Sequence, residues 1–377
     1  MKNLLVIHQS AELYGSDKTL LLFLEGLDKS IFFPVVILPS DGPLKIALEN
    51  SNITVYIAPV LKLYRKIFTP GNLLSFIRDI KTTQRFLAKL HQQYCFTIVY
   101  SNTLAVLAGL FFSKRHHLKH VWHVHEIIVH PKLIAALYPK ILNRFAQVII
   151  CNSAATRENL TERLPALKNK CVIVYNGLNA STPDGFNAAN KNSEHKDTIT
   201  VTLIGRISRL KGHKWLLSTY INFLKSKNIK LLFVGSPVEG QEYYLDEVNK
   251  IITENGLETE ITVMDFTQNL ETVWQATDIA VMPSTEAESF GLVALEAMLR
   301  KKPVIASNHG GVTEIVVDKQ TGLLVSPGNE EALAKAILTL AFDEKKRESF
   351  GLAGYERAAA KFSLQNYIDG ITHVLNI

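Results

Sequence analysis

Short apolar runs alternate with longer amphipathic stretches along most of the chain. In the first half, six apolar runs of seven residues each are rich in β-branched residues, and several end in polar side chains. Runs of this kind are typical of short strands buried on both faces of a sheet. They predict strands at 3–9, 33–39, 53–59, 96–102, 120–126 and 147–153.

Helical stretches lie between most of these runs, for example at 19–27 and 72–92. Strands that alternate with helices predict a parallel sheet with helices on both faces. In such open sheets, ligands bind beyond the carboxyl ends of the strands, so the loops after each strand are the places to search for function.

A polar segment at 179–197, rich in Asn, Ser, Gly and Asp, interrupts the pattern and predicts a linker. The alternation then restarts, with strands expected at 199–205, 229–235, 261–266, 279–284, 303–307 and 322–326. We therefore expect an α/β protein with two doubly wound, Rossmann-like domains, at 1–178 and 198–362.

Composition fits this organisation. With 377 residues, 47% of them hydrophobic and 20% charged, the chain is long enough for two globular domains. The three cysteines, Cys95, Cys151 and Cys171, have no metal-ligand spacing and favour a reducing compartment. The first ten residues do not resemble a signal peptide, and no run reaches the ~20 apolar residues of a spanning helix. We expect a cytoplasmic location.

Charge is unevenly distributed between the two halves. Residues 1–190 hold 21 Lys/Arg and 11 Asp/Glu, a balance of +10, whereas residues 191–377 hold 20 and 24, a balance of −4. The asymmetry predicts an anionic partner for the first half: a membrane surface, a phosphorylated acceptor or nucleic acid. Residues 61–89 carry seven cations against the single acid Asp79, which suits either an anionic membrane surface or a solvated helix face. The cations are Lys62, Arg65, Lys66, Arg78, Lys81, Arg85 and Lys89.

A basic loop, "GRISRLKG" at 205–212, follows the first strand of the second domain. Arg206, Arg209 and Lys211 stand between a strand end and a helix start, where the helix dipole also attracts anions. The loop predicts a phosphate site or, equally well, a solvated basic turn. It matches neither the P-loop nor the Rossmann glycine fingerprint.

The segment "ESFGLVALEAM" at 288–298 places two acids on either side of an apolar run. We expect Glu288 in a polar loop and Glu296 two turns into a helix, with Gly291 allowing a ligand close to the backbone. Each carboxylate could accept hydrogen bonds from a sugar's vicinal hydroxyls, so the pair could hold two ends of one extended ligand. Glu288 could instead be an exposed loop acid, and Glu296 a solvated or capped one.

Two further features stand at strand ends in the first half. His123 and His125 are two residues apart and so share one face of a strand. They could contact a reacting group, form part of a metal site without an evident third ligand, or bond within the sheet edge, which suits His123 better. Gly15 follows the first strand and could allow backbone contact with a phosphate or simply make a turn.

Taken together, the motifs resemble those of glycosyltransferase family 4, whose members have the GT-B fold. The resemblance covers nearly the whole chain and is strongest from 199 to 326. It rests on "YNGLN" (175–179), "GRISRLKG", "ESFGLVALEAM", "KPVIAS" (302–307) and "GGVTEIV", which begins at Gly310. In this fold the last helix crosses back to the first domain, so 363–377 is expected to pack there.

The resemblance also implies roles for particular residues. Glu296 would bind the ribose of the donor, Glu288 the hydroxyls of the donor sugar, and Arg206 and Lys211 the departing diphosphate. His125 would lie near the reacting centre of the first domain. Backbone contacts to the donor are implied at Phe290, Gly291 and Leu292, and Gly15 would lie in the loop that meets either the donor phosphate or the acceptor.

The implied reaction is a metal-independent transfer of a sugar, with retention of anomeric configuration. The donor would be a UDP- or GDP-linked sugar, without a further cofactor, and the acceptor a lipid-linked molecule or polysaccharide. The product would be an O-antigen of lipopolysaccharide, a capsule or a similar glycan made at the inner face of the cytoplasmic membrane. Alternatives are a sugar phosphorylase or epimerase of the same architecture and a basic nucleic-acid-binding protein, against which the acidic second half argues.

Overall fold

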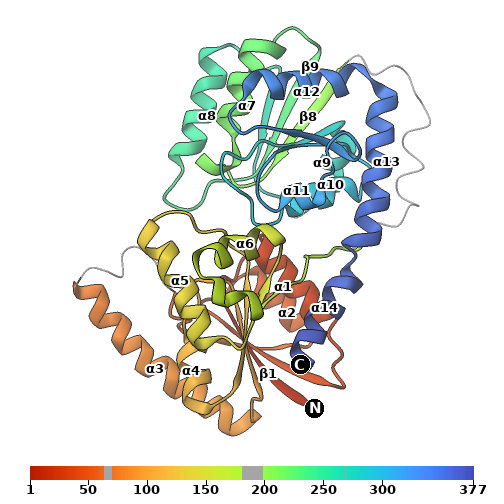
Figure 1. Cartoon of the computed structure of the whole chain (residues 1–377). Helices are drawn as coiled ribbons and strands as arrows, with labels where there is room; N and C mark the ends of the chain where they lie inside the picture. Colours follow the sequence, from red (N-terminus) through yellow and green to blue (C-terminus); the bar gives the residue numbers. More distant parts are fainter. Residues whose placement is uncertain (63–69, 181–197, 268) are drawn as a thin grey trace. The chain divides into compact units, whose positions relative to one another are not determined.

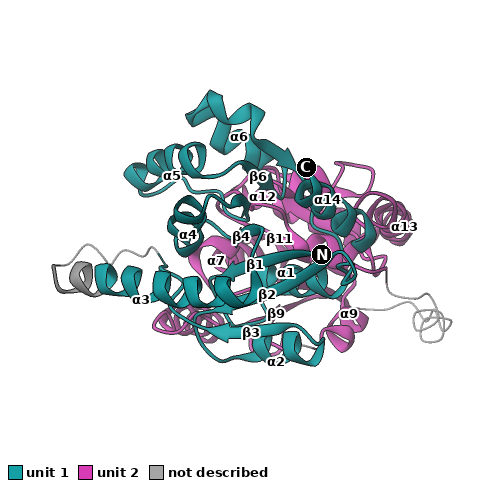
Figure 2. Cartoon of the chain, turned by 90° about the horizontal axis from the view of Figure 1, so that it is seen from below, with its two compact units in different colours: residues 1–177, 364–377 teal, residues 178–363 magenta. Residues whose placement is uncertain are grey.

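The computed structural model describes residues 1–62, 70–180, 198–267 and 269–377 (Figure 1). The chain divides into two compact units, which Figure 2 shows in different colours. Unit 1 contains residues 1–177 and 364–377, and unit 2 contains residues 178–363. Most of the predicted linker, at 181–197, and the cations Arg65 and Lys66 lie outside the described residues.

Unit 1 is built on a seven-stranded parallel sheet with the order β3-β2-β1-β4-β5-β6-β7. Its strands are β1 (Lys2–His8), β2 (Phe32–Leu38), β3 (Thr54–Ile57), β4 (Ile98–Asn102), β5 (Lys119–Val124), β6 (Val148–Cys151) and β7 (Cys171–Ile173). Its helices are α1 (Gly15–Glu25), α2 (Pro43–Asn50), α3 (Pro70–Tyr94), α4 (Ala108–His116), α5 (Lys132–Phe145), α6 (Ala154–Arg163), the 3₁₀ helix η2 (Pro165–Asn169) and α14 (Leu364–Asn376).

The alternation of side chains along β1 shows why both faces of this sheet are covered. Leu5 and Ile7 face one layer, where they belong to a core that includes side chains from α3 to α6. Leu4 and Val6 face the other layer and belong to a core with α1, α2 and α14. The last helix of the chain is therefore part of unit 1, beside α1 (Figures 1 and 2).

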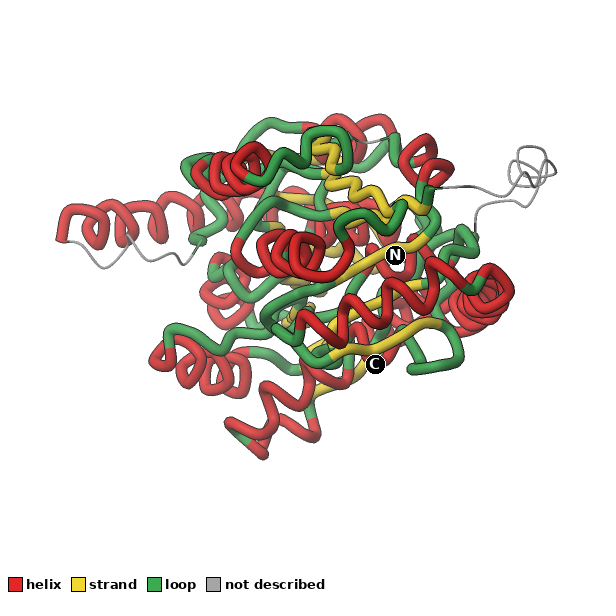
Figure 3. Tube along the Cα trace, turned by 90° about the horizontal axis from the view of Figure 1, so that it is seen from above, coloured by secondary structure: helices red, strands yellow, loops and turns green. Residues whose placement is uncertain are grey.

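Unit 2 repeats the design with six parallel strands in the order β10-β9-β8-β11-β12-β13. They are β8 (Ile199–Ile204), β9 (Ile229–Val234), β10 (Ile261–Met264), β11 (Ile279–Met282), β12 (Val304–Ser307) and β13 (Gly322–Val325). The helices are η4 (Arg209–Lys211), α7 (His213–Thr219), its π-helical continuation η5 (Tyr220–Leu224), α8 (Tyr243–Glu254), α9 (Glu271–Ala276), α10 (Leu292–Met298), α11 (Val312–Ile315), α12 (Glu330–Phe342) and α13 (Glu344–Lys361). Figure 3 traces the chain with its helices in red and its strands in yellow.

The two doubly wound sheets confirm the predicted fold class, and the predicted strands all correspond to observed ones. Predicted and observed strand ends differ by no more than two residues, and three further details differ. The short strand β7 was not predicted. β5 ends at Val124, so His125 and Glu126 follow the strand, because the His125 N–H donates to the Glu126 carboxylate at 3.0 Å and not to a neighbouring strand. Glu296 is only the fifth residue of α10, because Gly291, with φ of 113°, caps the helix.

Candidate functional site

In each sheet the strand order reverses at one point, and polar side chains follow the strands there. In unit 1 the reversal lies between β1 and β4, and in unit 2 it lies between β8 and β11. At such a reversal, the loops after the two neighbouring strands run to opposite faces of the sheet. A crevice remains between these loops, and ligands bind there in folds of this class. Both candidate sites lie at these positions.

In unit 2, Lys211 and Glu288 come from loops 77 residues apart and form an ion pair, with Nζ and Oε1 at 2.6 Å. The Ser284 hydroxyl donates to the same carboxylate oxygen, also at 2.6 Å. Burial by itself raises the pKa of Glu288, but the Lys211 charge, the two hydrogen bonds and the nearby His309 together hold that pKa below its ordinary value. Glu288 is therefore an ionised, partly buried acid.

Glycines allow the two loops to approach this closely. Gly212 has φ of 78°, and a Cβ there would lie 1.8 Å from the Pro283 carbonyl oxygen. The backbone N–H of Thr285 donates to the Leu210 carbonyl at 2.9 Å, and the Thr285 hydroxyl donates to the Arg209 carbonyl at 3.0 Å. The loop that carries Lys211 is thus fastened along its length to the loop that carries Glu288.

A third loop, after β12, supports Glu288 from behind. The Gly311 N–H donates to the Glu288 carbonyl at 2.7 Å, and a Cβ on Gly310 would lie 2.3 Å from that oxygen. His309 and Ser307 contact the carbonyl of Ser284, at 3.0 and 2.7 Å. The turn at His309–Gly311 therefore holds the loop of Glu288 in place.

The helix that follows Glu288 has a buried start. Phe290 is buried and packs edge-on against Phe362, with ring centroids 5.9 Å apart. Gly291 precedes Leu292, the first residue of α10. Glu296, further along α10, is buried to 7% exposure among apolar residues. Glu288 thus lies in the loop before α10, and Glu296 lies on the helix itself.

The remaining cations of this loop differ in their surroundings. Arg206 is exposed, two residues after the end of β8. Arg209 forms an exposed ion pair with Glu286, a residue of the acidic loop. A cavity of about 320 Å³ lies beside the same loop and is lined by Ile207, Ser208, Arg209, Gly212, His213, Lys214, Trp215, Tyr244, Val248 and Thr285. Neither Lys211 nor Glu288 lines it, so this cavity is separate from the ion pair.

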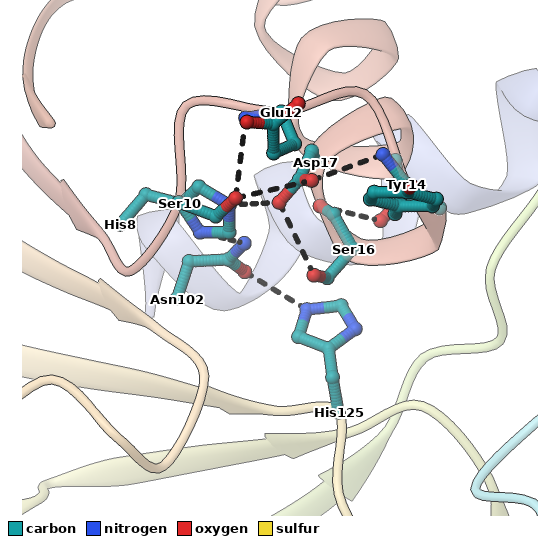
Figure 4. Close-up of polar contacts among 9 residues, drawn as sticks. His8, Ser10, Glu12, Tyr14, Ser16, Asp17, Asn102 and His125 are labelled. Atoms are coloured by element: carbon teal, nitrogen blue, oxygen red, sulfur yellow. Dashed lines mark hydrogen bonds and ion pairs between the residues drawn. The ribbon is translucent and has the colours of Figure 1, made fainter. Parts of the chain in front are cut away.

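In unit 1, His125 stands at the end of a chain of hydrogen-bonded side chains (Figure 4). His125 Nε2 lies 2.8 Å from Asn102 Oδ1, and Asn102 Nδ2 lies 3.0 Å from His8 Nδ1. His8 Nε2 lies 2.6 Å from Asp17 Oδ1. The chain joins the ends of β1, β4 and β5 to the first turn of α1. Burial, with a further contribution from His8, lowers the pKa of His125 to about 3, so its ring is neutral.

Glu126, next to His125, is a second unusual acid. Its carboxylate accepts the N–H of Leu104 and the N–H of His125, at 3.1 and 3.0 Å. Burial raises the pKa of Glu126 to about 7, although these two hydrogen bonds act in the opposite direction. A carboxyl group that titrates near neutrality beside His125 is a candidate for proton exchange at this site.

His123 has a structural role. Its Nδ1 lies 2.6 Å from the Tyr100 hydroxyl, and both residues are fully buried. Burial, and then His125, hold the pKa of His123 well below its usual range. The bonding of His123 within the sheet matches the alternative favoured for it. Within the described parts of the chain, no three His, Cys, Asp or Glu residues gather as a metal site would require.

Gly15 is the exposed first residue of α1, and its neighbour Tyr14 is the N-cap. The Tyr14 N–H donates to Asp17 Oδ2 at 3.0 Å, so the Asp17 carboxylate both caps α1 and contacts His8.

None of the described helices is both long and apolar enough to cross a bilayer.

Sequence reasoning missed several residues of these two sites. His8 and Asn102 are the last residues of their strands, and Asp17 lies in the loop-to-helix segment "GSDK". The feature that could have identified them is their position at the reversal of strand order. Ser284 and His309 likewise follow β11 and β12. Each type of residue is common in turns, and only the order of strands shows that these particular residues converge.

Two family models match consecutive parts of the chain. The model described as Glycosyltransferase Family 4 matches residues 15–182, and the model described as Glycosyl transferases group 1 matches residues 186–357. The junction between the two matches falls close to the boundary between units 1 and 2.

Among curated proteins, the chain is 30% identical to the capsular polysaccharide biosynthesis glycosyltransferase CapM of Staphylococcus aureus over 238 residues, which is 61% of each chain. The aligned part thus spans about three fifths of that relative's length. It is 27% identical over 252 residues to a Campylobacter jejuni N-acetylgalactosaminyltransferase that acts on a diphospho-undecaprenol-linked glycan, covering 66% of this chain and 64% of the relative.

Among solved structures, Anabaena HepE in complex with UDP and glucose superposes over 100% of both chains, with a TM-score of 0.83 and 23% identity. The apo form of the lipopolysaccharide outer core galactosyltransferase WaaB has a TM-score of 0.73 and 16% identity, covering 99% of this chain and 100% of the other. At these levels of sequence identity, the structural similarity establishes the fold alone.

Proposed function

The chain belongs to glycosyltransferase family 4 and has the GT-B fold, and on that premise we propose that it transfers a sugar from a nucleotide-diphospho-sugar to a glycan or lipid-linked acceptor, with retention of configuration. The observation that carries the proposal is the Lys211–Glu288 ion pair at the reversal of strand order in unit 2. It places a cation for phosphate and an acceptor for hydroxyl groups side by side, as a sugar-diphosphate donor requires.

The donor is held by groups from one continuous segment and one basic loop. Glu296 on α10 accepts hydrogen bonds from the ribose, and Glu288 accepts them from the donor sugar. The backbone at Phe290, Gly291 and Leu292 approaches the sugar and phosphates. The Glu296 carboxylate is an acceptor of hydrogen bonds, and a ribose offers two hydroxyl donors. UDP-glucose is the first donor to test, because HepE was crystallised with it.

Cations of the chain take the role that a metal ion has in other transferases. Lys211 and the exposed Arg206 stabilise the negative charge that develops on the diphosphate as the sugar leaves. The departing phosphate accepts the acceptor's proton on the same face of the sugar, which accounts for retention without a protein nucleophile. No metal ion takes part in this scheme.

The acceptor side of the proposal rests on unit 1. Arg78, Lys81, Arg85 and Lys89 of α3 are all exposed, and their spacing places them in one stripe along the helix. A cationic stripe suits an anionic membrane surface, at which a lipid-linked acceptor would be presented. We propose peripheral attachment at the cytoplasmic face of the membrane and synthesis of a bacterial surface glycan, such as a capsule or an O-antigen, in keeping with CapM and the Campylobacter relative.

Binding of the donor tests the first half of the proposal. Nucleotide-sugars are added singly to the purified chain, and the melting temperature and the release of nucleoside diphosphate are measured. One donor is expected to raise the melting temperature and to be hydrolysed slowly. Glu296→Ala should abolish both effects, whereas Glu254→Ala, at an exposed position of α8, should not. Failure of every UDP- and GDP-sugar would overturn the proposal.

Sedimentation with lipid vesicles tests the second half. The chain is expected to sediment with vesicles that contain anionic lipid, and less so as salt rises. Charge reversal of Arg78, Lys81 and Arg85 should release it. The same reversal at Lys225, Lys227 and Lys230, three exposed cations of unit 2, is the matched control and should have little effect. Equal binding by both variants would contradict attachment through α3.

A further inference from the structure

We propose that Asp17, His8 and Asn102 are positioning residues that hold the His125 ring in one tautomer, with a lone pair on Nδ1. The ring can then accept a hydrogen bond from a hydroxyl group of the bound sugar substrate. The assignment of a sugar as the ligand rests on the proposed function, whereas the tautomer follows from the hydrogen-bonded chain alone (Figure 4).

The argument begins at Asp17, whose contacts identify it as an acceptor. The backbone N–H of Tyr14 can only donate, and it lies 3.0 Å from Asp17 Oδ2. The hydroxyls of Ser10 and Ser16 lie 3.4 and 3.5 Å from the two carboxylate oxygens. An ionised carboxylate offers acceptor sites only. The His8 Nε2 at 2.6 Å from Oδ1 must therefore carry the hydrogen.

The next two links follow from the chemistry of imidazole and amide groups. The amide nitrogen Nδ2 of Asn102 can only donate, so His8 Nδ1, which lies 3.0 Å from it, accepts and the ring hydrogen of His8 is on Nε2. The amide is then oriented with Oδ1 toward His125, at 2.8 Å from Nε2. Because Oδ1 can only accept, His125 Nε2 carries the hydrogen. The neutral ring of His125 is left with a bare Nδ1.

Burial protects this series of hydrogen-bonded side chains from rearrangement. His8, Asn102 and Asp17 are 0%, 1% and 2% exposed. Solvent cannot readily supply a substitute partner, so turning the Asn102 amide would oppose two donors or two acceptors at once. The contacts of Asp17 thus select the tautomer of His125 at the other end of this series of hydrogen bonds, although Asp17 itself does not touch His125.

The acceptor atom is open to a ligand. His125 is only partly buried, and across residues 1–62, 70–180, 198–267 and 269–377 its Nδ1 has no hydrogen-bond partner. In Figure 4 the second ring nitrogen points away from Asn102. A lone pair in this position favours a group that donates a hydrogen. A sugar hydroxyl meets that requirement, whereas a fluorine or a deprotonated oxygen does not.

Nitrogen NMR of the apoprotein tests the tautomer without any assumption about activity. In protein labelled with ¹⁵N-histidine, His125 is assigned through the signals that disappear in His125→Gln. We expect a pyrrole-type Nε2 and a pyridine-type Nδ1 in the wild-type chain. A protonated Nδ1 with a bare Nε2 would overturn the proposal.

Two matched variants test whether the chain sets that tautomer. Asn102→Asp keeps an acceptor opposite His125 Nε2 and should preserve the pattern. Asp17→Asn removes the anchor and can donate to His8, so it should shift part or all of the His125 population to the other tautomer. The thermal unfolding of each variant shows that it is folded. If the ¹⁵N signals of His125 are unchanged in folded Asp17→Asn, the hydrogen bonds that start at Asp17 do not set the tautomer of His125.

A kinetic comparison links the tautomer to the substrate. Donors in which one sugar hydroxyl at a time is replaced by fluorine are compared by kcat/KM. At one position the wild-type chain should lose up to about tenfold, the value of one neutral hydrogen bond. In Asp17→Asn the loss at that position should shrink, while Asn102→Asp retains it. If no donor is used at all, the proposed function fails and the NMR result still stands. If transfer occurs and no such difference is found, His125 does not accept from the substrate.

Discussion

The ammonium nitrogen of Lys211 lies 2.6 Å from Oε1 of Glu288, although the two residues belong to different loops. The pair is partly buried, and each side chain holds the other in place before any ligand binds. In the proposed donor complex, the diphosphate would therefore share or displace Glu288 as the partner of Lys211. This competition would give the two residues opposite effects on nucleotide binding.

Glu288→Gln should tighten the binding of a nucleoside diphosphate, by about three- to tenfold, because a repelling charge and a competitor for Lys211 are both removed. Transfer of the sugar should fall at the same time, since the variant has a weaker acceptor for the sugar hydroxyls. Calorimetric titration with UDP and a transfer assay measure the two effects. Glu286→Gln, which removes an exposed acid of the same loop, is the control. Weaker UDP binding by Glu288→Gln would show that the acid helps to hold the nucleotide.

Gly310→Ala should destabilise unit 2 and weaken donor binding. Its φ of 69° favours glycine, and the added Cβ would lie 2.3 Å from the Glu288 carbonyl oxygen. Gly240→Ala has a similar φ of 77° with no atom within 4 Å of the added Cβ, so it should cost only the backbone strain, about 1 kcal/mol. Urea denaturation and UDP titration of both variants separate strain from displacement of the loop. Equal losses would mean that the loop yields without moving Glu288.

Glu126→Gln should change how stability depends on pH. In the unfolded chain the carboxyl has its ordinary pKa of 4.5, and burial raises this to about 7 in the folded chain. Between these values the folded chain binds the extra proton, so stability is full at low pH and falls as pH rises through 7. The full loss is about 3 kcal/mol, at about 1.4 kcal/mol per pKa unit.

The variant should therefore gain stability relative to the wild-type chain at pH 8 and gain less or none at pH 5. Differences in melting temperature at the two pH values measure this effect. Glu158→Gln, at an exposed position of α6, is the matched control and should show no such difference. A gain that is the same at both pH values would indicate that Glu126 titrates normally.

Tyr100 and His123 should behave as a coupled pair in the core of unit 1. Burial raises the pKa of Tyr100 well above its usual value, so the phenol is neutral, and its hydroxyl forms a hydrogen bond with His123 Nδ1 at 2.6 Å. Tyr100→Phe and His123→Leu should each cost about 1–3 kcal/mol, because each leaves a buried polar atom without its partner. The double variant should cost less than the sum of the two. Additive losses, measured by urea denaturation, would contradict the coupling.

The repeated apolar runs were sufficient to predict the two parallel sheets. Runs such as 199–205 are long enough that burial on both faces leaves a clear signal, and the observed β8 differs at its end by one residue. The three residues of β7 have one buried, one exposed and one intermediate position, which gives no such signal. Strand ends were less predictable, because a local contact can end the hydrogen bonding between strands. The backbone N–H of His125 donates to the Glu126 carboxylate and not to a neighbouring strand.

The candidate sites were predictable in unequal measure. Lys211, Glu288 and Glu296 belong to motifs that a family resemblance can identify from sequence alone. That Lys211 pairs with Glu288 depends on the neighbouring positions of β8 and β11, which the sequence does not state. The chain from Asp17 to His125 draws on three strands and a helix, and its members look like ordinary turn residues in isolation.

The return of α14 to unit 1 has a consequence for the order in which the protein is made. The first 177 residues leave the ribosome with one face of their sheet still lacking Tyr367, Ile371 and the rest of α14. Unit 2 is contiguous in sequence and is synthesised before that helix emerges. Unit 2 can therefore finish folding before unit 1, although unit 1 begins first. A chain truncated after residue 363 would therefore keep the whole of unit 2 but lack α14 of unit 1.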